Sequence, residues 1–394
     1  MPTQIGVGLS HHRNPKIAGQ EAARKAMDQA GSTEVNFVLM FASVGYPQQR
    51  LVESVRAATG HAPLCGCSGE GTIAMGETDE SNFSVSVMVF SSDELQFNHG
   101  LTSGLQADPA QTGNEVGQTV QPQLRPDTIA LFLFADGLTF NFDRFLQGLE
   151  TALEQPLPLF GGTSSDNWQL KRTYQYYNDQ VMSDAVVWLL LSGQGRLAWA
   201  VNHGCLPIGS KRQITRCEHN AIYEIDGKPA LAVLKEYLTE DEVDNWHKTV
   251  INLCLGLKAP SDLQTQYDEY LIRFIPAKND ELASIAIQTE VSEGTEIWMT
   301  RRDCAKIEAG VHRIGTAIAD QLQGETPKCV FHFDCAGRGK AIFRDQQKLD
   351  LLNLLQSNIG TNVPWIGFYT YGEIGPVGSR NCFHNYTAVI AALY

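Results

Sequence analysis

Three short segments of the chain combine glycine turns with acids and hydroxyls, the groups that hold small polar ligands. They are Gly66-Cys67-Ser68-Gly69-Glu70, the run from Gly161 to Asp166, and the run from Gly367 to Glu373. A carboxylate can pair with an ammonium group, and the hydroxyls or backbone amides of glycine turns can bind a carboxylate. The three segments therefore predict a site for a small zwitterion such as an amino acid.

The expected ligand-binding residues lie at strand ends or in the turns that follow them: Ser43, Ser68, Glu70, Asp136, Thr163, Ser164, Asp166, Tyr371, Glu373 and His384. Tyr371 could close one wall of the pocket, because a phenol offers an apolar ring and a hydroxyl. The structural alternative is that the Ser, Thr and Asp side chains only cap helices and close turns, and that His384 is a hydrogen-bonded structural residue.

Glu70 and Glu373 each follow a turn of small or aromatic residues. We expect them in matching places, one from each half of the chain, with at least one facing a pocket between the halves. The alternative is that both carboxylates only accept backbone amides in their own loops.

Catalysis is the other class of function to weigh. Cys67 lies in a turn that could present a thiol nucleophile, but the spacing indicates no histidine partner and no Gly-x-Ser-x-Gly motif occurs. The glycine turns also lack the Lys-Ser/Thr ending of a phosphate loop. Glu70 and Glu373 would suit acid–base chemistry if they lay close together. We expect a non-enzymatic binding protein, with a thiol or carboxylate enzyme as an alternative.

No resident cofactor or metal is expected. Cys65 and Cys67 form Cys-x-Cys, which differs from the Cys-x-x-Cys of zinc sites, and most of the nine cysteines are expected to be buried and reduced. Haem needs an axial ligand, usually His, Cys or Met. The candidates are His203, His247, His332 and His384, and none of them stands in a Cys-x-x-Cys-His motif.

The elements that must position these segments repeat three times along the chain. Each copy has an apolar strand, a helix, a second strand that carries the glycine turn, and a closing strand. The first strands begin at Val35, Thr128 and Lys328, the helices are expected near 50–58, 142–153 and 348–356, and the closing strands near 83–90, 185–191 and 386–393.

A strand, a helix and a strand in this order predict a parallel pair with a right-handed crossover. The fold class is therefore α/β, with layered mixed sheets built from repeated strand-helix-strand-strand units. Ligands collect beyond the carboxyl ends of such strands, so the three turns should lie at one edge of the architecture. Asp136 should then lie within side-chain reach of the turn at 161–164.

A different stretch separates the second and third copies. Residues 213–218 and 221–225 predict a hairpin around His219-Asn220, and Asp226-Gly227-Lys228-Pro229 breaks the chain before a helix over 230–238. Strands are expected at 271–275, 283–288 and 297–300. Two domains are predicted, residues 1–225 with two units and residues 226–394 with the third.

The composition narrows the class of partner. Acids number 44 and bases 30, for a net charge of −14, and the basic residues are scattered, so neither nucleic acid nor an anionic membrane is an expected partner. No apolar run reaches the ~18 residues of a membrane span, and the N-terminus lacks the features of a signal peptide. We expect a soluble protein of the cytoplasm.

The chain resembles the FIST proteins, bacterial sensory proteins with an N-terminal and a C-terminal FIST domain. The likeness rests on the turn at 66–70, the run at 157–167, His203-Gly204 with Pro207-Ile208-Gly209, the runs at 223–230 and 367–374, and His384-Asn385-Tyr386-Thr387.

The resemblance implies a signal-input module that binds a small ligand such as an amino acid, or, in some members, haem with a response to nitric oxide. Many members are fused to a transmitter domain. Here the sensor takes up all 394 residues, so a separate partner protein, such as a kinase, is expected to carry the output.

Overall fold

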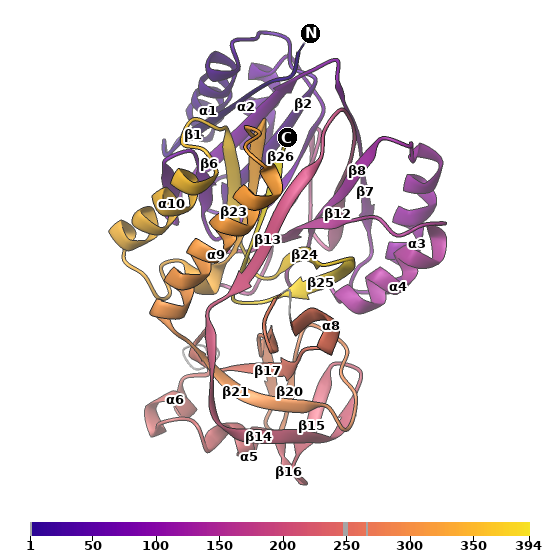
Figure 1. Ribbon diagram of the computed structural model, residues 1–394, viewed down its shortest axis with the longest axis vertical. Coiled ribbons are helices and arrows are strands. Elements are labelled where there is room, and N and C mark those ends of the chain that lie inside the picture. Colours follow the sequence, from indigo (N-terminus) through magenta and orange to yellow (C-terminus); the bar gives the residue numbers. More distant parts are fainter. Residues whose placement is uncertain (1, 247–250, 265–266) are drawn as a thin grey trace.

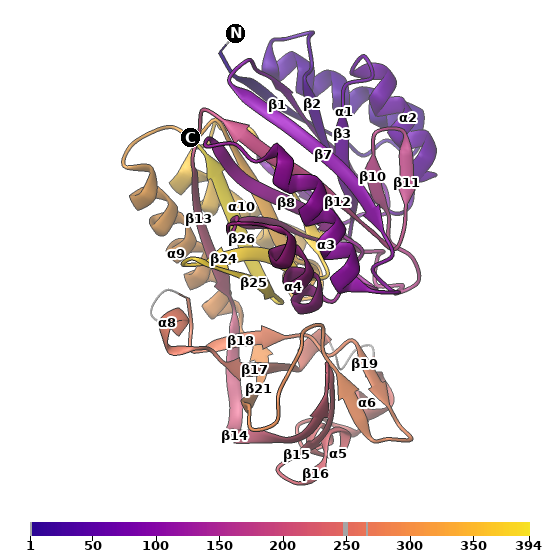
Figure 2. The same ribbon diagram turned by 90° about the vertical axis from the view of Figure 1, so that its right-hand side faces the viewer.

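Three copies of one unit form the larger part of the molecule, and a separate sheet lies below them (Figure 1; Figure 2). The computed structural model describes residues 2–246, 251–264 and 267–394. Each unit has an edge strand, a helix, a first strand, a second helix, a second strand, a two-stranded hairpin and a closing strand. The predicted repeat is confirmed. Each unit also contains elements that were not predicted, namely the edge strand with its helix and the hairpin.

The bounds of the elements follow the chain order. Unit one contains β1 Gln4–Ser10, α1 Pro15–Ala30, β2 Phe37–Ser43, α2 Gln48–Ala58, β3 Leu64–Gly69, β4 Thr72–Ala74, β5 Glu77–Asp79 and β6 Val85–Ser91. Unit two contains β7 Leu95–Ser103, α3 Pro109–Val120, β8 Thr128–Ala135, α4 Phe142–Ala152, β9 Leu159–Thr163, β10 Gln175–Tyr177, β11 Gln180–Met182 and β12 Ala185–Gly193. Unit three contains β13 Leu197–His203, α9 Cys304–Leu322, β22 Cys329–Cys335, α10 Asp345–Ile359, β23 Trp365–Thr370, β24 Glu373–Val377, β25 Arg380–His384 and β26 Thr387–Leu393.

Each unit builds one six-stranded sheet and completes it with a hairpin from another unit. The order is edge strand, closing strand, first strand, second strand and then the foreign hairpin. Hairpin β10–β11 of unit two pairs with β3, β24–β25 of unit three pairs with β9, and β4–β5 of unit one pairs with β23. The first and second strands are parallel in all three units, which confirms the predicted crossovers.

In each unit the helix that comes before the first strand has the same type of start. Asn14, Asp108 and Asp303 are the N-caps of α1, α3 and α9, and their side chains accept backbone N–H groups of the first turn. Such caps satisfy donors that a helix start otherwise leaves free. The units therefore share local sequence signals despite their different residues.

One glycine of each second strand lies against the backbone of the neighbouring first strand. A Cβ at Gly66, Gly161 or Gly367 would lie 1.7, 2.0 or 1.9 Å from the carbonyl oxygen of the paired residue. The paired residues are Met40, Leu133 and His332. Only glycine fits so close an approach, so these glycines mark equivalent positions.

The inner faces of the three sheets meet in one apolar core. Phe41, Phe134 and Phe333 occupy equivalent places on the three first strands, and the ring centroids are 5.3 Å apart for Phe41 and Phe134 and 6.2 Å apart for Phe134 and Phe333. Helices cover the outer faces (Figure 1). The carboxyl ends of the second strands, which carry the predicted segments, lie together where the three units meet.

The remaining strands, which come between β13 and α9 in the sequence, form a fourth sheet. Its elements are β14 Cys205–Glu218, β15 Ala221–Ile225, β16 Lys228–Pro229, α5 Ala230–Lys235, α6 Glu240–Asp244, β17 Cys254–Lys258, α8 Ser261–Gln264, β18 Tyr270–Arg273, β19 Ala277–Asn279, β20 Ser284–Ala286 and β21 Glu296–Arg302. The predicted hairpin of β14 and β15 is confirmed. The predicted domain boundary after residue 225 stays a prediction; in the structure β15, which ends there, pairs with β16 and β20 of this sheet.

Candidate functional site

The three glycine turns interlock through a cycle of backbone hydrogen bonds. Ser165 N donates to Ser68 O at 3.1 Å, and Glu70 N donates to Tyr369 O at 2.9 Å. Tyr371 N closes the cycle by donating to Thr163 O at 3.2 Å. The prediction that the turns lie together is confirmed.

This cycle corrects the expected match between Glu70 and Glu373. The residues that donate in the cycle are Glu70, Ser165 and Tyr371, so Tyr371 is the counterpart of Glu70 in unit three. Glu373 lies two residues further on, where Thr370 Oγ1 and Thr387 N donate to its carboxylate at 2.5 and 3.2 Å. Burial raises the pKa of Glu373 well above its usual range.

The other predicted residues are buried, and several already hold backbone groups. Asp136 accepts hydrogen bonds from Leu138 N and Asp184 N at 2.8 and 2.9 Å. Its neighbour Ala135 accepts a bond from Ser164 N, which confirms the expected proximity of Asp136 to that turn. His384 Nε2 lies 3.0 Å from Gly375 O, and burial lowers the pKa of His384 to about 3. The structural alternative thus accounts for the contacts of Asp136 and His384.

Ser43, Ser68, Thr163 and Asp166 complete this group. Ser68 Oγ donates to Ser165 O at 2.8 Å, and Thr163 Oγ1 donates to Gly372 O at 3.4 Å. Asp166 accepts three backbone amides, from residues 170, 171 and 172. Ser43 Oγ is buried and forms no hydrogen bond within the described residues. As ligand-binding residues, the ten stay a prediction.

Glu70 stands out because its carboxylate is buried and only partly satisfied. Trp168 N donates to Glu70 Oε2 at 3.1 Å and to Tyr371 Oη at 2.8 Å, and Tyr371 in turn donates to Asp166. Glu70 Oε1 forms no hydrogen bond within the described residues, and Lys340 Nζ lies 3.4 Å away. Burial raises the pKa of Glu70 to about 7, against the opposing charge of Lys340.

Alternating charges lead from Glu70 to the outer face of the unit-three sheet. Lys340 N donates to Glu80 Oε2 at 2.6 Å, so one loop residue contacts both acids. Glu80 Oε2 also lies 2.7 Å from Lys348 Nζ on α10, with 1% and 3% of these side chains exposed. Burial raises the pKa of Glu80, although Lys348 opposes this shift.

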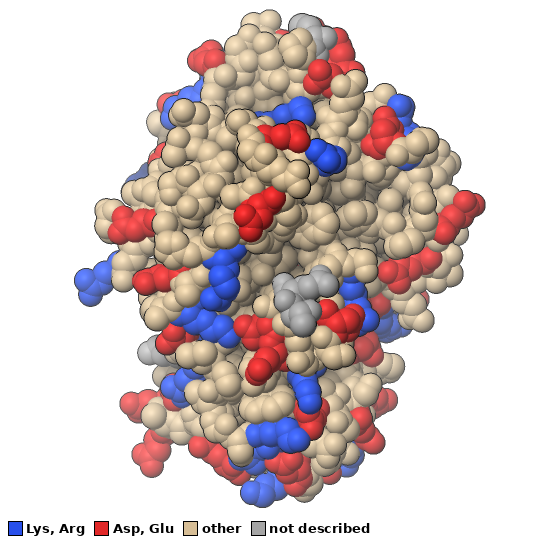
Figure 3. Space-filling view, viewed as in Figure 1, with Lys and Arg blue, Asp and Glu red and all other residues tan. Residues whose placement is uncertain are grey.

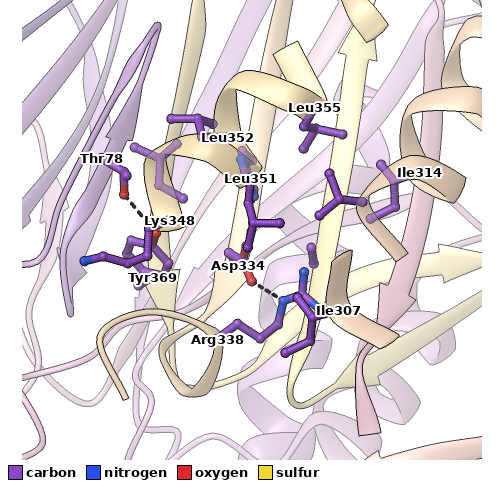
Figure 4. Close-up of a pocket in the computed structure, with 14 residues that line it drawn as sticks. Thr78, Ile307, Ile314, Asp334, Arg338, Lys348, Leu351, Leu352, Leu355 and Tyr369 are labelled. Carbon is purple, nitrogen blue, oxygen red and sulfur yellow. Dashed lines mark hydrogen bonds and ion pairs between the residues drawn. The ribbon is translucent and has the colours of Figure 1, made fainter. Parts of the chain in front are cut away.

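A small cavity lies at the end of this chain of charges, between α9, α10 and the sheet (Figure 4). We call it the Arg338 pocket; its volume is 30 Å³, and its polar lining residues are Thr78, His332, Asp334, Arg338, Lys348 and Tyr369. The apolar lining comes from the two helices, from Ile73 and from Ala388. A charged wall thus faces an apolar one.

Asp334 and Arg338 form the charged centre of the pocket. Arg338 Nε donates to Asp334 Oδ1 at 2.7 Å, and His332 Nε2 lies 3.2 Å from Asp334 Oδ2. Burial alone would raise the pKa of Asp334, but the Arg338 charge and the His332 hydrogen bond lower it below its usual value. Arg338 Nη1 is buried and forms no hydrogen bond within the described residues. Arg338, which lines the pocket, therefore retains a free cationic donor.

None of the ten predicted residues lines the Arg338 pocket. The sequence predicts that the first strand of unit three begins at Lys328, and Asp334 lies at the carboxyl end of this strand. Ligands collect beyond the carboxyl ends of such strands, so this position also qualifies as a predicted site. The following run, Cys335-Ala336-Gly337-Arg338-Gly339-Lys340, is another small-residue turn. Its position after a first strand, and not after a second strand, left it outside the predicted set.

Two family models match the chain in sequence order. The FIST N domain matches residues 36–228, and the FIST C domain matches residues 230–376. The chain belongs to the FIST family. The two matches confirm the FIST resemblance noted in the sequence. FIST domains are sensory, signal-related domains.

The relatives of this FIST chain include uncharacterized proteins of similar length. MT0656 of Mycobacterium tuberculosis is 27% identical over 98% of this chain and 99% of its own length. Mb0898c of Mycobacterium bovis is 25% identical over 98% of each. MJ1623 of Methanocaldococcus jannaschii is 22% identical over 92% of this chain and 73% of its own length.

Solved structures similar to the FIST chain include a chorismatase and the cyanuric acid hydrolase of A. caulinodans. The chorismatase covers the whole chain with a TM-score of 0.38 at 8% identity. The hydrolase covers 99% with a TM-score of 0.35 at 10% identity. Likenesses this distant do not bear on the activity of the FIST chain.

Haem does not fit His203, His332 or His384, the predicted haem ligands that lie among the described residues of the FIST chain. Trp365 Nε1 donates to His332 Nδ1 at 3.2 Å and the other ring nitrogen faces Asp334, beside a cavity far too small for a porphyrin. His203 accepts Cys205 N and lies 3.2 Å from Asp268. His384 is held by Gly375, and His247 lies outside the described residues.

Cys67 does not face solvent or the Arg338 pocket. It lies in the apolar core between the sheets, where burial raises the pKa of the thiol well above its usual value. A thiol nucleophile needs access and a stabilised thiolate, and Cys67 has neither.

Within the described residues, no helix has the length and apolar composition of a membrane span.

Proposed function

We propose that this FIST chain is a cytoplasmic sensory protein that binds a small amino-acid-like metabolite in the Arg338 pocket. The protein binds the metabolite without converting it, and a separate partner protein carries the signal onward. The sensory character of FIST domains supports the first part of this proposal.

The buried, unbonded Nη1 of Arg338 is the observation that carries the proposal. Leaving a buried donor without an acceptor costs about 1–3 kcal/mol or more for a charged group. A ligand carboxylate would accept this bond, and Asp334 beside it would attract an ammonium group. The two opposite charges match the two ends of a zwitterion, and the leucines of α10 would contact its side chain (Figure 4).

The size of the pocket makes binding a conformational event. Its 30 Å³ are about the volume of one water molecule in the liquid, which is too small for an amino acid. Entry therefore requires α10 and the loop at 336–344 to move away from α9. A ligand that binds only the opened state shifts the population toward it, which is how a sensor transmits occupancy.

A thermal-shift screen of the twenty amino acids and of simple carboxylates tests the proposal. A bound metabolite should raise the melting temperature, and calorimetric titration should give its affinity. Arg338→Gln should weaken binding about tenfold or more, because a charge-assisted bond is lost. Arg50→Gln, on the exposed surface of unit one, should leave the affinity unchanged. The proposal fails if no compound shifts the melting temperature.

Glu70 supports an acid–base enzyme as a second candidate function. A buried carboxyl with a pKa near 7 beside a lysine is typical of residues that exchange protons during catalysis. Incubation of each hit with the protein, followed by mass spectrometry, separates the two functions. Unchanged ligand supports sensing, and a product that disappears in Glu70→Gln supports catalysis.

A further inference from the structure

The three units create three equivalent clefts, each between an edge strand and the hairpin that completes a neighbouring sheet. Two of them are closed by side chains. His11, just after β1, lies 2.5 Å from Glu77 and 2.6 Å from Asp79 on hairpin β4–β5. In the second cleft, His99 of β7 lies 3.1 Å from Asn178 at the β10–β11 turn, and its ring packs against Tyr177.

The third cleft is bridged by a side chain at one end and is otherwise open. It is a groove of 480 Å³ between β13, α9 and the turn of hairpin β24–β25, within the range of about 300–1,000 Å³ typical of binding sites. Trp199 Nε1 donates to Pro376 O at 3.0 Å and forms one end of it. The surface over β13 and beside α9 is hollowed and carries few charged side chains (Figure 3).

The floor of this groove is an unpaired strand edge. Arg196 and Tyr394 exchange both backbone hydrogen bonds, which fixes the register of β13 against β26. The backbone N–H and C=O groups of the even-numbered residues of β13 therefore point toward β26, and those of the odd-numbered residues point toward the groove. The N–H and C=O of Val201 therefore point outward, and neither is bonded within the described residues. An open edge of this kind is a template for another strand.

A side chain already imitates part of such a strand. Gln321 of α9 accepts from Trp199 N at 3.1 Å and donates to Trp199 O at 2.8 Å, as a peptide group of an added strand would do. Arg313 lies about two turns before Gln321 on α9, and among the described residues it is the one charged side chain that lines the groove, in a chain of net charge −14. It hydrogen bonds only Asn202 Oδ1 among the described residues, at 3.3 Å, which leaves donors free.

We propose that this groove binds an extended peptide segment of a partner protein as an added strand on β13, with a carboxylate of that segment on Arg313. The strand edge supplies backbone hydrogen bonds, α9 supplies the opposite wall, and Arg313 fixes the direction of the peptide. The inference identifies a surface for the partner in the proposed function. It is tested without any metabolite, so the two proposals fail independently.

The test uses random heptapeptides with free C-termini, selected on the immobilised full-length protein and then measured by fluorescence anisotropy. Val201→Pro removes the outward N–H, and proline is tolerated on an edge strand where that group makes no ladder bond. This variant and Arg313→Gln should each weaken binding about tenfold or more. Ala317→Trp should block the groove, whereas Ala319→Trp, exposed on the same helix, should not.

The melting temperature of each variant establishes that it folds, and Ala317→Trp keeps the test valid if Val201→Pro does not. Selected peptides that lose affinity in the groove variants and keep it in Ala319→Trp support the proposal. Failure to select any peptide overturns it. Peptides that bind wild type and Ala317→Trp equally also overturn it, because they bind elsewhere.

Discussion

Lys348 Nζ lies 2.7 Å from Glu80 Oε2 in a part of the protein that water hardly reaches. The two residues belong to different units, since Glu80 follows the hairpin of unit one and Lys348 lies on α10 of unit three. The ion pair therefore attaches that hairpin to the helix that covers the Arg338 pocket.

Removing one partner of this pair should be costly. Lys348→Met leaves Glu80 buried without its main countercharge, and the free energy of unfolding should fall by about 3–5 kcal/mol. Adding Glu80→Gln to the same variant should restore part of the loss. Urea unfolding measures both effects. Arg125→Met, which breaks the exposed pair with Asp127, serves as the control and should change little.

Glu70 should make stability depend on pH. Its pKa of about 7 exceeds the value of 4.5 in an unfolded chain, so the folded state holds an extra proton between these values. The contribution of Glu70 to stability therefore decreases as the pH rises through this window. Relative to wild type, Glu70→Gln should gain about 3 kcal/mol between pH 4.5 and 8. Parallel pH profiles of unfolding for the two proteins would contradict the assignment.

The equivalent glycines allow a test of the three-fold architecture. Gly367→Ala places a Cβ 1.9 Å from the carbonyl oxygen of His332, so strands β22 and β23 must separate. We expect a loss of more than about 3 kcal/mol or failure to fold. Gly60→Ala is the control, because a Cβ there meets no atom within 4 Å and only the φ of +65° costs stability, about 1–2 kcal/mol. Equal effects of the two substitutions would show that β23 is not packed against β22 as described.

Thiol chemistry separates the core cysteines from the exposed one. Cys304 is exposed at the start of α9, whereas Cys67 is fully buried. A disulfide reagent such as Ellman's reagent should react rapidly with Cys304 in the native protein, and Cys304→Ser should remove this fast phase. Cys67→Ser should leave the fast phase unchanged. A fast phase that depends on Cys67 would instead support the alternative that the protein is an enzyme with a thiol nucleophile.

Local pattern was enough to predict the first, second and closing strands of each unit and the crossover helix between the first two, but not the edge strands with their helices. The buried first strands carry continuous apolar runs, and glycine turns and prolines delimit the second strands. The hairpins of units one and two were missed because β4, β5, β10 and β11 are only three residues long and pair with sheets of other units. No periodicity can be recognised in three residues, and the partners are up to 296 positions away in the sequence, as for Thr72 and Phe368.

The candidate site was predicted in part. Sequence reasoning placed Glu70 at the convergence of the turns, which the structure confirms. It missed Arg338, because an arginine between two glycines is typical of an exposed loop, and its burial depends on α9 and α10 packing over it. It also paired Glu70 with Glu373, because motif likeness does not fix the register of a strand, whereas the backbone cycle does.

The exchange of hairpins has a consequence for synthesis on the ribosome. When unit one emerges, hairpin β4–β5 has no sheet to join until β23 has been made, almost 300 residues later. The first sheet also waits for β10 of unit two, and the second for β24 of unit three. Such long-range pairing slows folding and exposes strand edges in the meantime. The nascent chain should therefore depend on chaperones until its last unit leaves the exit tunnel, and any truncation that removes unit three should leave the first two unable to close.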